Sequence, residues 1–221
     1  MKNENNRHIN VGHALALNSD PDSIISYYAK WSETYDVDVL EGYVGIALIS
    51  DLMHQAMKSE DCQLENKDPA TLRVADVGCG TGLGGKALTD LGYTNIDGLD
   101  LSPEMIIKAR ESGWYAKLFD GVNINQSLPE DFHNVYDATV CLGVFTPGHV
   151  LPEALCQLVQ MTHSGGLVVV STRPEYYDTT DFQQVSDSIE AQGSAVLKRC
   201  YKDAPYRNDG NAHYWIYEVM L

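Results

Sequence analysis

The chain has 221 residues, 44% of them hydrophobic, which favours one soluble domain with a sizeable core. Its net charge of −16 disfavours nucleic acid and anionic membrane surfaces as partners. There is no run of about 18 apolar residues to span a bilayer, and residues 1–10 are too polar for a signal peptide. We therefore expect a cytoplasmic protein.

Cysteine and histidine usage indicates neither a disulfide framework nor a metal site. The five cysteines are odd in number and form no C-x-x-C pair, a pattern that fits a reducing compartment. No cluster with metal-ligand spacing stands out among the seven histidines, so we expect no bound metal.

Residues 1–70 are expected to form an N-terminal arm and a helical lid. Residues 1–18 are a polar arm, expected to be flexible and able to order over a ligand. A helix is predicted from Ser19-Asp20-Pro21 to about residue 34, because a capping residue and a proline mark its first turn. A second amphipathic helix is predicted over 43–57, followed by a charged linker over 59–70.

Four aromatic residues recur at helical spacing in the first of these helices: Tyr27, Tyr28, Trp31 and Tyr35. They share one helix face. That face is either a packing seam or a surface that closes over a cofactor and an acceptor, with tyrosine hydroxyls available to polar ligand groups.

Strands and helices alternate over residues 71–221, which predicts a doubly wound, Rossmann-like, mostly parallel sheet of seven strands. Strands are predicted at 72–77, 94–100, 114–119, 135–142 and 166–172. Helices are predicted at 82–91, 103–112, 152–162 and 180–192. Two last strands, 194–201 and 213–221, are separated by the turn-rich segment 203–211 and predict a C-terminal antiparallel hairpin.

The stretch 74–85 reads as a buried strand that ends in clustered glycines and turns into a helix. Glycine allows positive φ and close approach of a ligand, while the new helix offers unpaired N–H groups. Gly80-x-Gly82-x-x-Gly85 also spells the dinucleotide fingerprint, with Asp100 twenty residues after Gly80. The pattern alone is weak, and it leaves a nicotinamide-dependent oxidoreductase open.

Asp76 favours one kind of ligand, because a carboxylate two residues before Gly78 would crowd a bound pyrophosphate but suits a positively charged ligand. With D-x-G-x-G-x-G followed by Gly98-Leu99-Asp100-Leu101-Ser102, the chain resembles the class I S-adenosylmethionine-dependent methyltransferases. The resemblance implies a Rossmann-like core whose last strand is inserted antiparallel, S-adenosylmethionine as cofactor, and S-adenosylhomocysteine as product.

In this reading Asp100 accepts hydrogen bonds from the ribose hydroxyls, and Asp120 matches the superfamily's adenine contact. Leu101, Met105 and Val122 would supply apolar walls to the ring. Cys79 and Cys141 are expected to be small apolar side chains in cofactor loops. The full set expected to bind the cofactor is Tyr28, Trp31, Tyr35, Asp76, Gly78, Cys79, Gly80, Thr81, Gly82, Asp100, Leu101, Met105, Asp120, Gly121, Val122, Cys141, Leu142 and Gly143.

Three further stretches, 35–39, 92–105 and 143–150, are similar to a narrower group of methyltransferase-like proteins, typified by the Williams–Beuren syndrome region protein 27. The likeness runs from about Trp31 to the C-terminus. Pro147 departs from the histidine expected there in that group, which removes one potential ligand contact.

His149, in the loop after the fourth predicted strand, is the candidate general base, because imidazole titrates near neutral pH. The alternative is an ordinary hydrogen-bonded loop histidine. Arg173 is the lone Lys or Arg between residues 118 and 197, and either clamps an acceptor carboxylate or pairs with Glu175 or Asp178. Weaker candidates for the pocket wall are Tyr176, Tyr177, Tyr206 and His213.

We therefore expect a methyltransferase that acts on a small molecule by in-line displacement, as a monomer or homodimer. The expected partner is a small-molecule acceptor, because the chain has no large insertion on which a macromolecule could dock. A non-catalytic protein that binds S-adenosylmethionine or S-adenosylhomocysteine is the main alternative.

Overall fold

The computed structural model of this protein describes residues 12–208 and 210–220. Its centre is a seven-stranded sheet with the strand order β3-β2-β1-β4-β5-β7-β6. The strands are β1 (Arg73–Val77), β2 (Asn95–Leu99), β3 (Lys117–Phe119), β4 (Tyr136–Phe145), β5 (Thr162–Thr172), β6 (Ala195–Arg207) and β7 (Gly210–Val219). Strands β1 to β5 are parallel, and β7 runs antiparallel between β5 and β6. The predicted mostly parallel sheet with an antiparallel C-terminal hairpin is confirmed.

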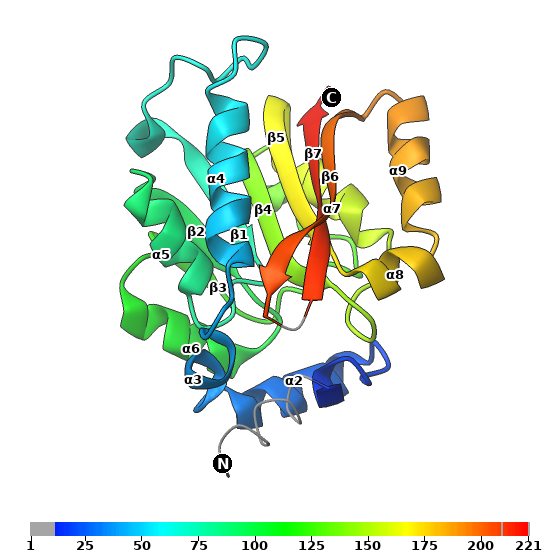
Figure 1. The fold of residues 1–221 in the computed structure, drawn as a ribbon. Helices are drawn as coiled ribbons and strands as arrows, with labels where there is room; N and C mark the ends of the chain where they lie inside the picture. Colours follow the sequence, from blue (N-terminus) through cyan, green and yellow to red (C-terminus); the bar gives the residue numbers. More distant parts are fainter. Residues whose placement is uncertain (1–11, 209, 221) are drawn as a thin grey trace.

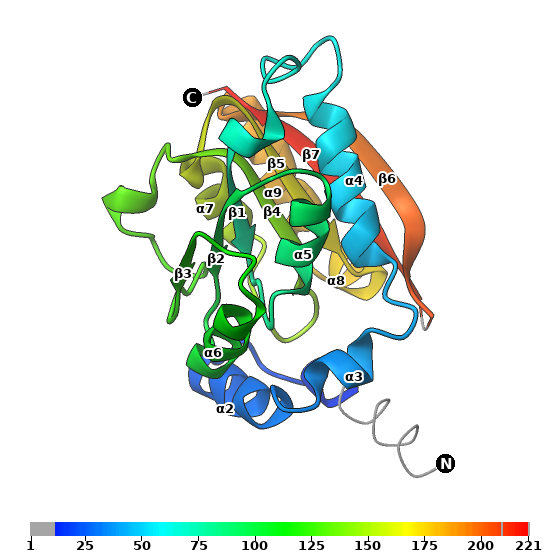
Figure 2. The same ribbon diagram turned by 90° about the vertical axis from the view of Figure 1, so that its left-hand side faces the viewer.

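Helices cover both faces of the sheet (Figures 1 and 2). The α-helices are α2 (Pro21–Trp31), α3 (Tyr35–Val39), α4 (Gly45–Met57), α5 (Leu83–Asp90), α6 (Pro103–Ser112), α7 (Ala154–Met161), α8 (Pro174–Thr179) and α9 (Phe182–Ala191). Two short 3-10 helices are η1 (Pro69–Thr71) and η2 (Glu130–Phe132).

Two hydrophobic cores lie on opposite faces of the sheet. Consecutive residues of β1 point to opposite faces, since Val74 packs under α4 and α5 while Ala75 packs with α7 and α9. Both are fully buried. Strands covered on both faces are apolar throughout and do not alternate between apolar and polar residues. For this reason the strands could be predicted from continuous apolar runs in the sequence.

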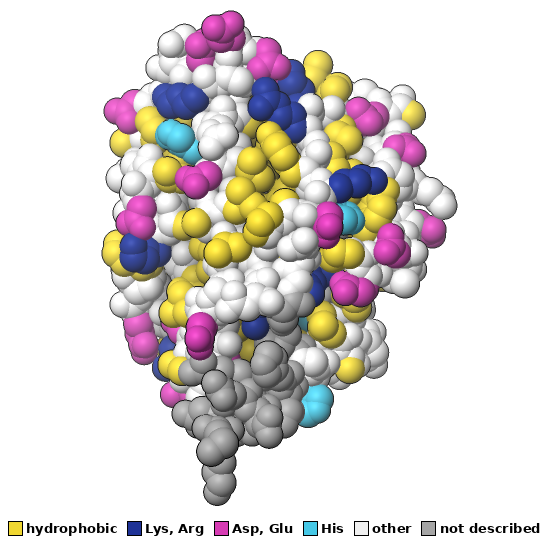
Figure 3. All heavy atoms as spheres, viewed as in Figure 1, with side chains coloured by type: hydrophobic (Ala, Val, Ile, Leu, Met, Phe, Trp, Pro, Cys, Tyr) yellow, Lys and Arg dark blue, Asp and Glu magenta, His cyan; other side chains and the backbone are white. Residues whose placement is uncertain are grey.

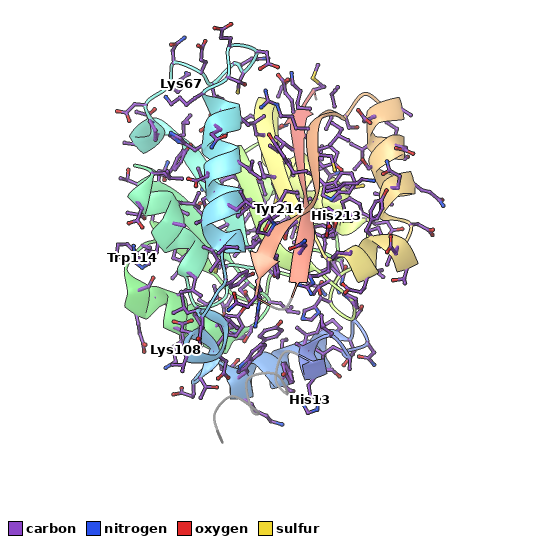
Figure 4. All side chains as sticks on the ribbon, in the orientation of Figure 1. His13, Lys67, Lys108, Trp114, His213 and Tyr214 are labelled. Atoms are coloured by element: carbon purple, nitrogen blue, oxygen red, sulfur yellow. The ribbon has the colours of Figure 1, made fainter. Side chains whose placement is uncertain are left out.

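Helices α2 and α3 lie across the carboxyl ends of the parallel strands, below the sheet in Figure 1, whereas α4 packs on one face of the sheet. Asp20 caps α2 by accepting a hydrogen bond from the Ser23 N–H, and Pro21 occupies the first turn. Lys108 of α6, labelled in Figure 4, lies 3.2 Å from the Glu33 carboxylate just after α2. The predicted helix to residue 34 ends earlier, at Trp31, and a separate helix α3 follows.

The C-terminal hairpin is longer than predicted. Segment 203–211 was expected to be a turn, but β6 extends to Arg207 and β7 begins at Gly210. Irregular pairing of β6 with β7 accommodates this polar segment within the ladder. The extension brings Tyr206 and Arg207 to the carboxyl edge of β5.

Other predictions differ from the structure mainly in element length. The predicted helix 180–192 corresponds to α9, and α8 was not predicted. Strand β3 is shorter than predicted, whereas β4 continues to Phe145 and β5 begins at Thr162. The part of the predicted N-terminal arm within residues 1–11 lies outside the described residues.

Among the described helices, none combines the length and apolarity needed to cross a bilayer. The His, Cys, Asp and Glu side chains in the described ranges also form no group suited to a metal ion. On the face shown in Figure 3, acidic side chains are spread around the margin and basic ones are interspersed among them.

Candidate functional site

The main cavity of the described residues opens at the carboxyl ends of the parallel strands, beneath α2 and α3. This is where an open α/β sheet binds ligands. Sequence-predicted residues on its wall are Tyr28, Trp31, Tyr35, Gly78, Gly80, Asp100, Leu101, Met105, Val122, Leu142, Gly143, His149 and Arg173. The sheet therefore brings together side chains from loops far apart in the chain.

The glycines after β1 divide into two groups. Gly78 and Gly80 line the cavity at positive φ, and a side chain added at Gly80 would meet no atom within 4 Å. By contrast, a Cβ on Gly85 would lie 2.5 Å from the Tyr115 ring, and one on Gly82 would lie 3.2 Å from it. Gly82 was predicted to contact the cofactor, but it lies off the cavity wall and makes room for Ser112 and Tyr115.

Asp100 stands at the end of β2 with its carboxylate held by the backbone. One oxygen accepts the Gly80 N–H at 2.9 Å and the other accepts the Ser102 N–H at 2.8 Å. The Ser102 side chain caps α6, which leaves Asp100 free of that task. Burial raises the pKa of Asp100 above its ordinary value, against these hydrogen bonds. Each carboxylate oxygen keeps lone-pair capacity for a further donor.

Asp76 lies beneath the floor of the cavity rather than on its wall. It is 5% exposed and accepts a 2.7 Å hydrogen bond from the Tyr115 hydroxyl. The same hydroxyl accepts the Gly85 N–H at 3.0 Å, at the start of α5. Burial raises the pKa of Asp76 to about 6, with a smaller contribution from the Asp100 charge. The carboxylate thus supports the glycine turn from below.

Several other predicted cofactor contacts also lie away from the cavity wall. Asp120 and Gly121 are exposed in the loop after β3. Cys79 is buried against Ile106 of α6, and Cys141 is buried within the core that α7 covers. The cysteines are free thiols, and burial raises the pKa of both Cys79 and Cys141, which fits small apolar side chains rather than nucleophiles.

The aromatic face of α2 and α3 forms the roof of the cavity. Tyr28 stacks on Trp31 with 5.8 Å between ring centroids, and Trp31 meets Tyr35 edge-on at 4.7 Å. Asp36 of α3 accepts a hydrogen bond from Thr81 in the glycine turn. Thr81, predicted to contact the cofactor, therefore joins the roof to the turn. The rings pack together, as one interpretation of this face predicts, and three of them, Tyr28, Trp31 and Tyr35, also line the cavity.

His149 lies in the loop after β4 and is 6% exposed. Its Nδ1 lies 3.0 Å from the Pro147 carbonyl oxygen and its Nε2 lies 2.8 Å from the Tyr28 hydroxyl. A carbonyl can only accept, so Nδ1 carries the proton and Nε2 accepts from Tyr28. Burial lowers the pKa of His149, which keeps the imidazole neutral near pH 7.

Arg173 follows β5 and its side chain is 13% exposed. Its Nε lies 3.8 Å from a Glu175 carboxylate oxygen, too far for a hydrogen bond, and its guanidinium carbon lies 5.0 Å from the centre of the Tyr206 ring. Of the weaker candidates, Tyr206 lines the cavity. His213 is turned to the opposite side of β7 from Tyr214 (Figure 4), and it contacts Tyr177 of α8.

Four further wall residues were not singled out in the sequence. Tyr43 precedes α4, Arg207 ends β6, and Asn123 and Asn125 follow β3. None belongs to a glycine turn or a charged strand end, and a folded β6 was needed to place Arg207 near β5. The position of Arg207 could have been predicted only if β6 had been predicted to extend beyond residue 201.

Comparisons with known proteins agree with this architecture. Residues 75–170 match the family described as a methyltransferase domain. Human methyltransferase-like protein 27 is 31% identical over 150 residues, covering 67% of this chain and 57% of that protein. The ubiquinone biosynthesis O-methyltransferase of Rickettsia typhi is 30% identical over 116 residues, covering 51% of this chain and 46% of that protein. The chain spans about half the length of these relatives.

Among solved structures, magnesium protoporphyrin IX methyltransferase from Synechocystis PCC 6803 with bound S-adenosylmethionine shares the fold, with a TM-score of 0.58. It is 18% identical, and the match covers 85% of this chain and 83% of that one. The antiparallel β7 also separates this sheet from the parallel dinucleotide-binding order 3-2-1-4-5-6. Strand order, domain match and relatives together assign the chain to the class I S-adenosylmethionine-dependent methyltransferase family.

Proposed function

We propose that this protein transfers the methyl group of S-adenosylmethionine to a small-molecule acceptor. The observation that carries the proposal is the Asp100 carboxylate, anchored by two backbone N–H groups at the edge of a cavity that reaches Gly80. The domain match and the family's cofactor support it.

The residues on the cavity wall fit this cofactor. Asp100 has lone-pair capacity left for the two ribose hydroxyls, and no side chain fills the space beside Gly80. Leu101, Met105 and Val122 offer apolar contacts to a ring. When bound, a sulfonium supplies an electrophilic methyl group, and Leu142 and Gly143 at the end of β4 would border it.

The chain's own contribution to transfer is alignment and exclusion of water. The roof residues Tyr28 and Trp31 close one side of the cavity. Where the acceptor carries a proton at working pH, Tyr28 and His149 provide a route for it. The acceptor proton would pass to the phenol oxygen as the phenol proton moves to Nε2 of His149.

A small acceptor is favoured by the enclosure of the site and by the charge of the chain. Elements α2 and α3 cover the strand ends from which a macromolecule would approach. A chain of net charge −16 also attracts RNA and DNA poorly. One curated relative is named as an O-methyltransferase of ubiquinone biosynthesis, and we take this as support for a small-molecule acceptor here.

Calorimetry and labelling test the proposal in two steps. The protein is first titrated with S-adenosylmethionine and S-adenosylhomocysteine, and then incubated with methyl-labelled cofactor and a metabolite extract of its source. We expect micromolar binding and a labelled metabolite below about 1 kDa. Absence of cofactor binding would overturn the cofactor site. Binding with no labelled product in repeated extracts would favour a non-catalytic binding protein.

A further inference from the structure

The end of the cavity away from Asp100 carries two arginines. Arg173 follows β5 and Arg207 ends β6, and they are the Lys or Arg side chains on the described cavity wall. Building on the function proposed above, we infer that this pair binds an anionic group of the methyl acceptor, a carboxylate or a phosphate. The acceptor is then a small organic anion.

Arg173 has donors available to such a group. Its Nε is buried and has no hydrogen-bond partner. Glu175 lies 3.8 Å away with a side chain that is 66% exposed, so solvent screens that ion pair. A buried guanidinium donor without a partner costs free energy, and a ligand oxygen that accepts from it would recover that cost.

Two tyrosine rings pack against the two arginines. The guanidinium carbon of Arg173 lies 5.0 Å from the centre of the Tyr206 ring, and that of Arg207 lies 5.7 Å from the centre of the Tyr43 ring. The hydroxyls of these two tyrosines lie 2.8 Å apart and hydrogen-bond to each other. A cation over an aromatic face keeps its charge and its in-plane N–H donors.

This cluster borders the end of β4. A Cβ on Gly143 would lie 2.7 Å from the Tyr206 hydroxyl and 3.0 Å from the Tyr43 hydroxyl. The strand order β2-β1-β4-β5 separates the end of β2 from that of β5 by three strand spacings, roughly 14 Å. Asp100 and the arginines thus occupy opposite ends of one cavity, with β1 and β4 between them.

Basic residues are scarce in this chain, which makes the presence of two arginines on one cavity wall a specific feature of the site. The protein has 31 acidic and 15 basic residues, and Arg173 is the single Lys or Arg in the 80 residues from 118 to 197. Two guanidinium groups on the wall of one cavity contribute positive potential there, which attracts an anion. The same pair would reject a cationic or neutral acceptor in favour of an anion.

The cofactor's own carboxylate is another anion that could reach the arginines, and two titrations distinguish it from the acceptor. S-adenosylhomocysteine carries that carboxylate, whereas 5′-methylthioadenosine lacks it. Both are titrated into the wild type, Arg173→Gln, Arg207→Gln and the surface control Arg110→Gln. We expect less than a threefold change in either affinity. Loss of tenfold or more for S-adenosylhomocysteine alone would assign the arginines to the cofactor and overturn the inference.

The anion site is then measured directly on protein saturated with S-adenosylhomocysteine. Inorganic phosphate and benzoate are titrated separately, so that the two arms distinguish phosphate from carboxylate. We expect millimolar binding of at least one, weakened at least tenfold in Arg173→Gln and Arg207→Gln and unchanged in Arg110→Gln. No binding of either anion, or equal binding by all variants, would overturn the inference.

Two controls keep the outcomes separate. Arg173→Lys retains the charge and supplies a folded variant if the glutamine substitution unfolds the protein, and we expect it to weaken anion binding less than Arg173→Gln. If the wild type binds no S-adenosylhomocysteine, the proposed function fails. The phosphate and benzoate titrations on the cofactor-free protein then still decide whether the arginines form an anion site.

Discussion

The hydroxyl of Tyr28 lies 2.8 Å from Nε2 of His149, across 121 residues of sequence. This hydrogen bond joins the roof helix α2 to the loop after β4. The other ring nitrogen of His149 is held by the Pro147 carbonyl, so the position of the imidazole is set from both sides. That carbonyl belongs to the backbone of Pro147, so it can orient His149 whichever side chain stands at position 147.

We predict that His149→Ala lowers kcat about 100-fold on an acceptor that must lose a proton, because the route through Tyr28 loses its base. The dissociation constant for S-adenosylhomocysteine should change less than threefold. Because burial holds the pKa of His149 below 6.5, the acidic limb of the wild-type pH–rate profile should fall below that pH.

The exposed His163, at the start of β5, provides the control, and His163→Ala should leave kcat unchanged. Equal kcat in His149→Ala and the wild type, measured with a verified acceptor, would remove the base from the mechanism.

Asp100→Ala should weaken S-adenosylhomocysteine binding about 100-fold. Two hydrogen bonds to a charged acceptor contribute roughly 1.5 kcal/mol or more each, and their loss corresponds to that factor. Calorimetry measures the change. Asp120→Ala is the matched control, since this exposed carboxylate lies off the cavity wall. A strong effect of Asp120→Ala would restore the adenine contact expected from the sequence.

Alanine substitutions at Gly80 and Gly85 should separate binding from stability. Gly85→Ala places a methyl group 2.5 Å from the Tyr115 ring and should lower the free energy of unfolding by about 1–3 kcal/mol. Gly80→Ala meets open space at a φ of 55°, so it should cost about 1 kcal/mol of stability while weakening cofactor binding about tenfold.

Urea unfolding and calorimetry on the same samples measure both quantities. If Gly85→Ala kept wild-type stability, the assignment of that glycine to the Tyr115 contact would be incorrect.

Asp76→Asn should change how stability depends on pH. The folded pKa of about 6 exceeds the ordinary value of 3.8, so the folded state binds more protons between these values. The wild type should therefore lose stability relative to Asp76→Asn as pH rises, by about 1–2 kcal/mol between pH 5 and pH 7.5. Above pH 7.5 the difference should be constant.

Urea unfolding across this range provides the measurement, with the exposed Asp131→Asn as a control whose difference from wild type stays flat. A flat difference for Asp76→Asn as well would show that this carboxyl ionises in the folded protein as it does in water.

The sequence by itself determined the order of strands and helices, the glycine turn after β1 and the position of Asp100 at a strand end. These features are local: apolar runs mark strands buried on both faces, and glycine marks a turn that a side chain would obstruct. Parallel strands then bring their carboxyl ends to one edge, so placing Gly78, Gly80 and Asp100 near one another required no knowledge of distant contacts.

Only the tertiary structure decided which residues share the space around that turn. Gly85 leaves space for the ring of Tyr115, thirty residues later in the chain. The hydroxyl of the same side chain donates a hydrogen bond to Asp76. Arg207 reaches the neighbourhood of Arg173 because β7 pairs with both β5 and β6. Hydrophobic periodicity records which face a residue presents, but not which distant element packs against that face, since this depends on how side-chain volumes and strand ends fit together in three dimensions.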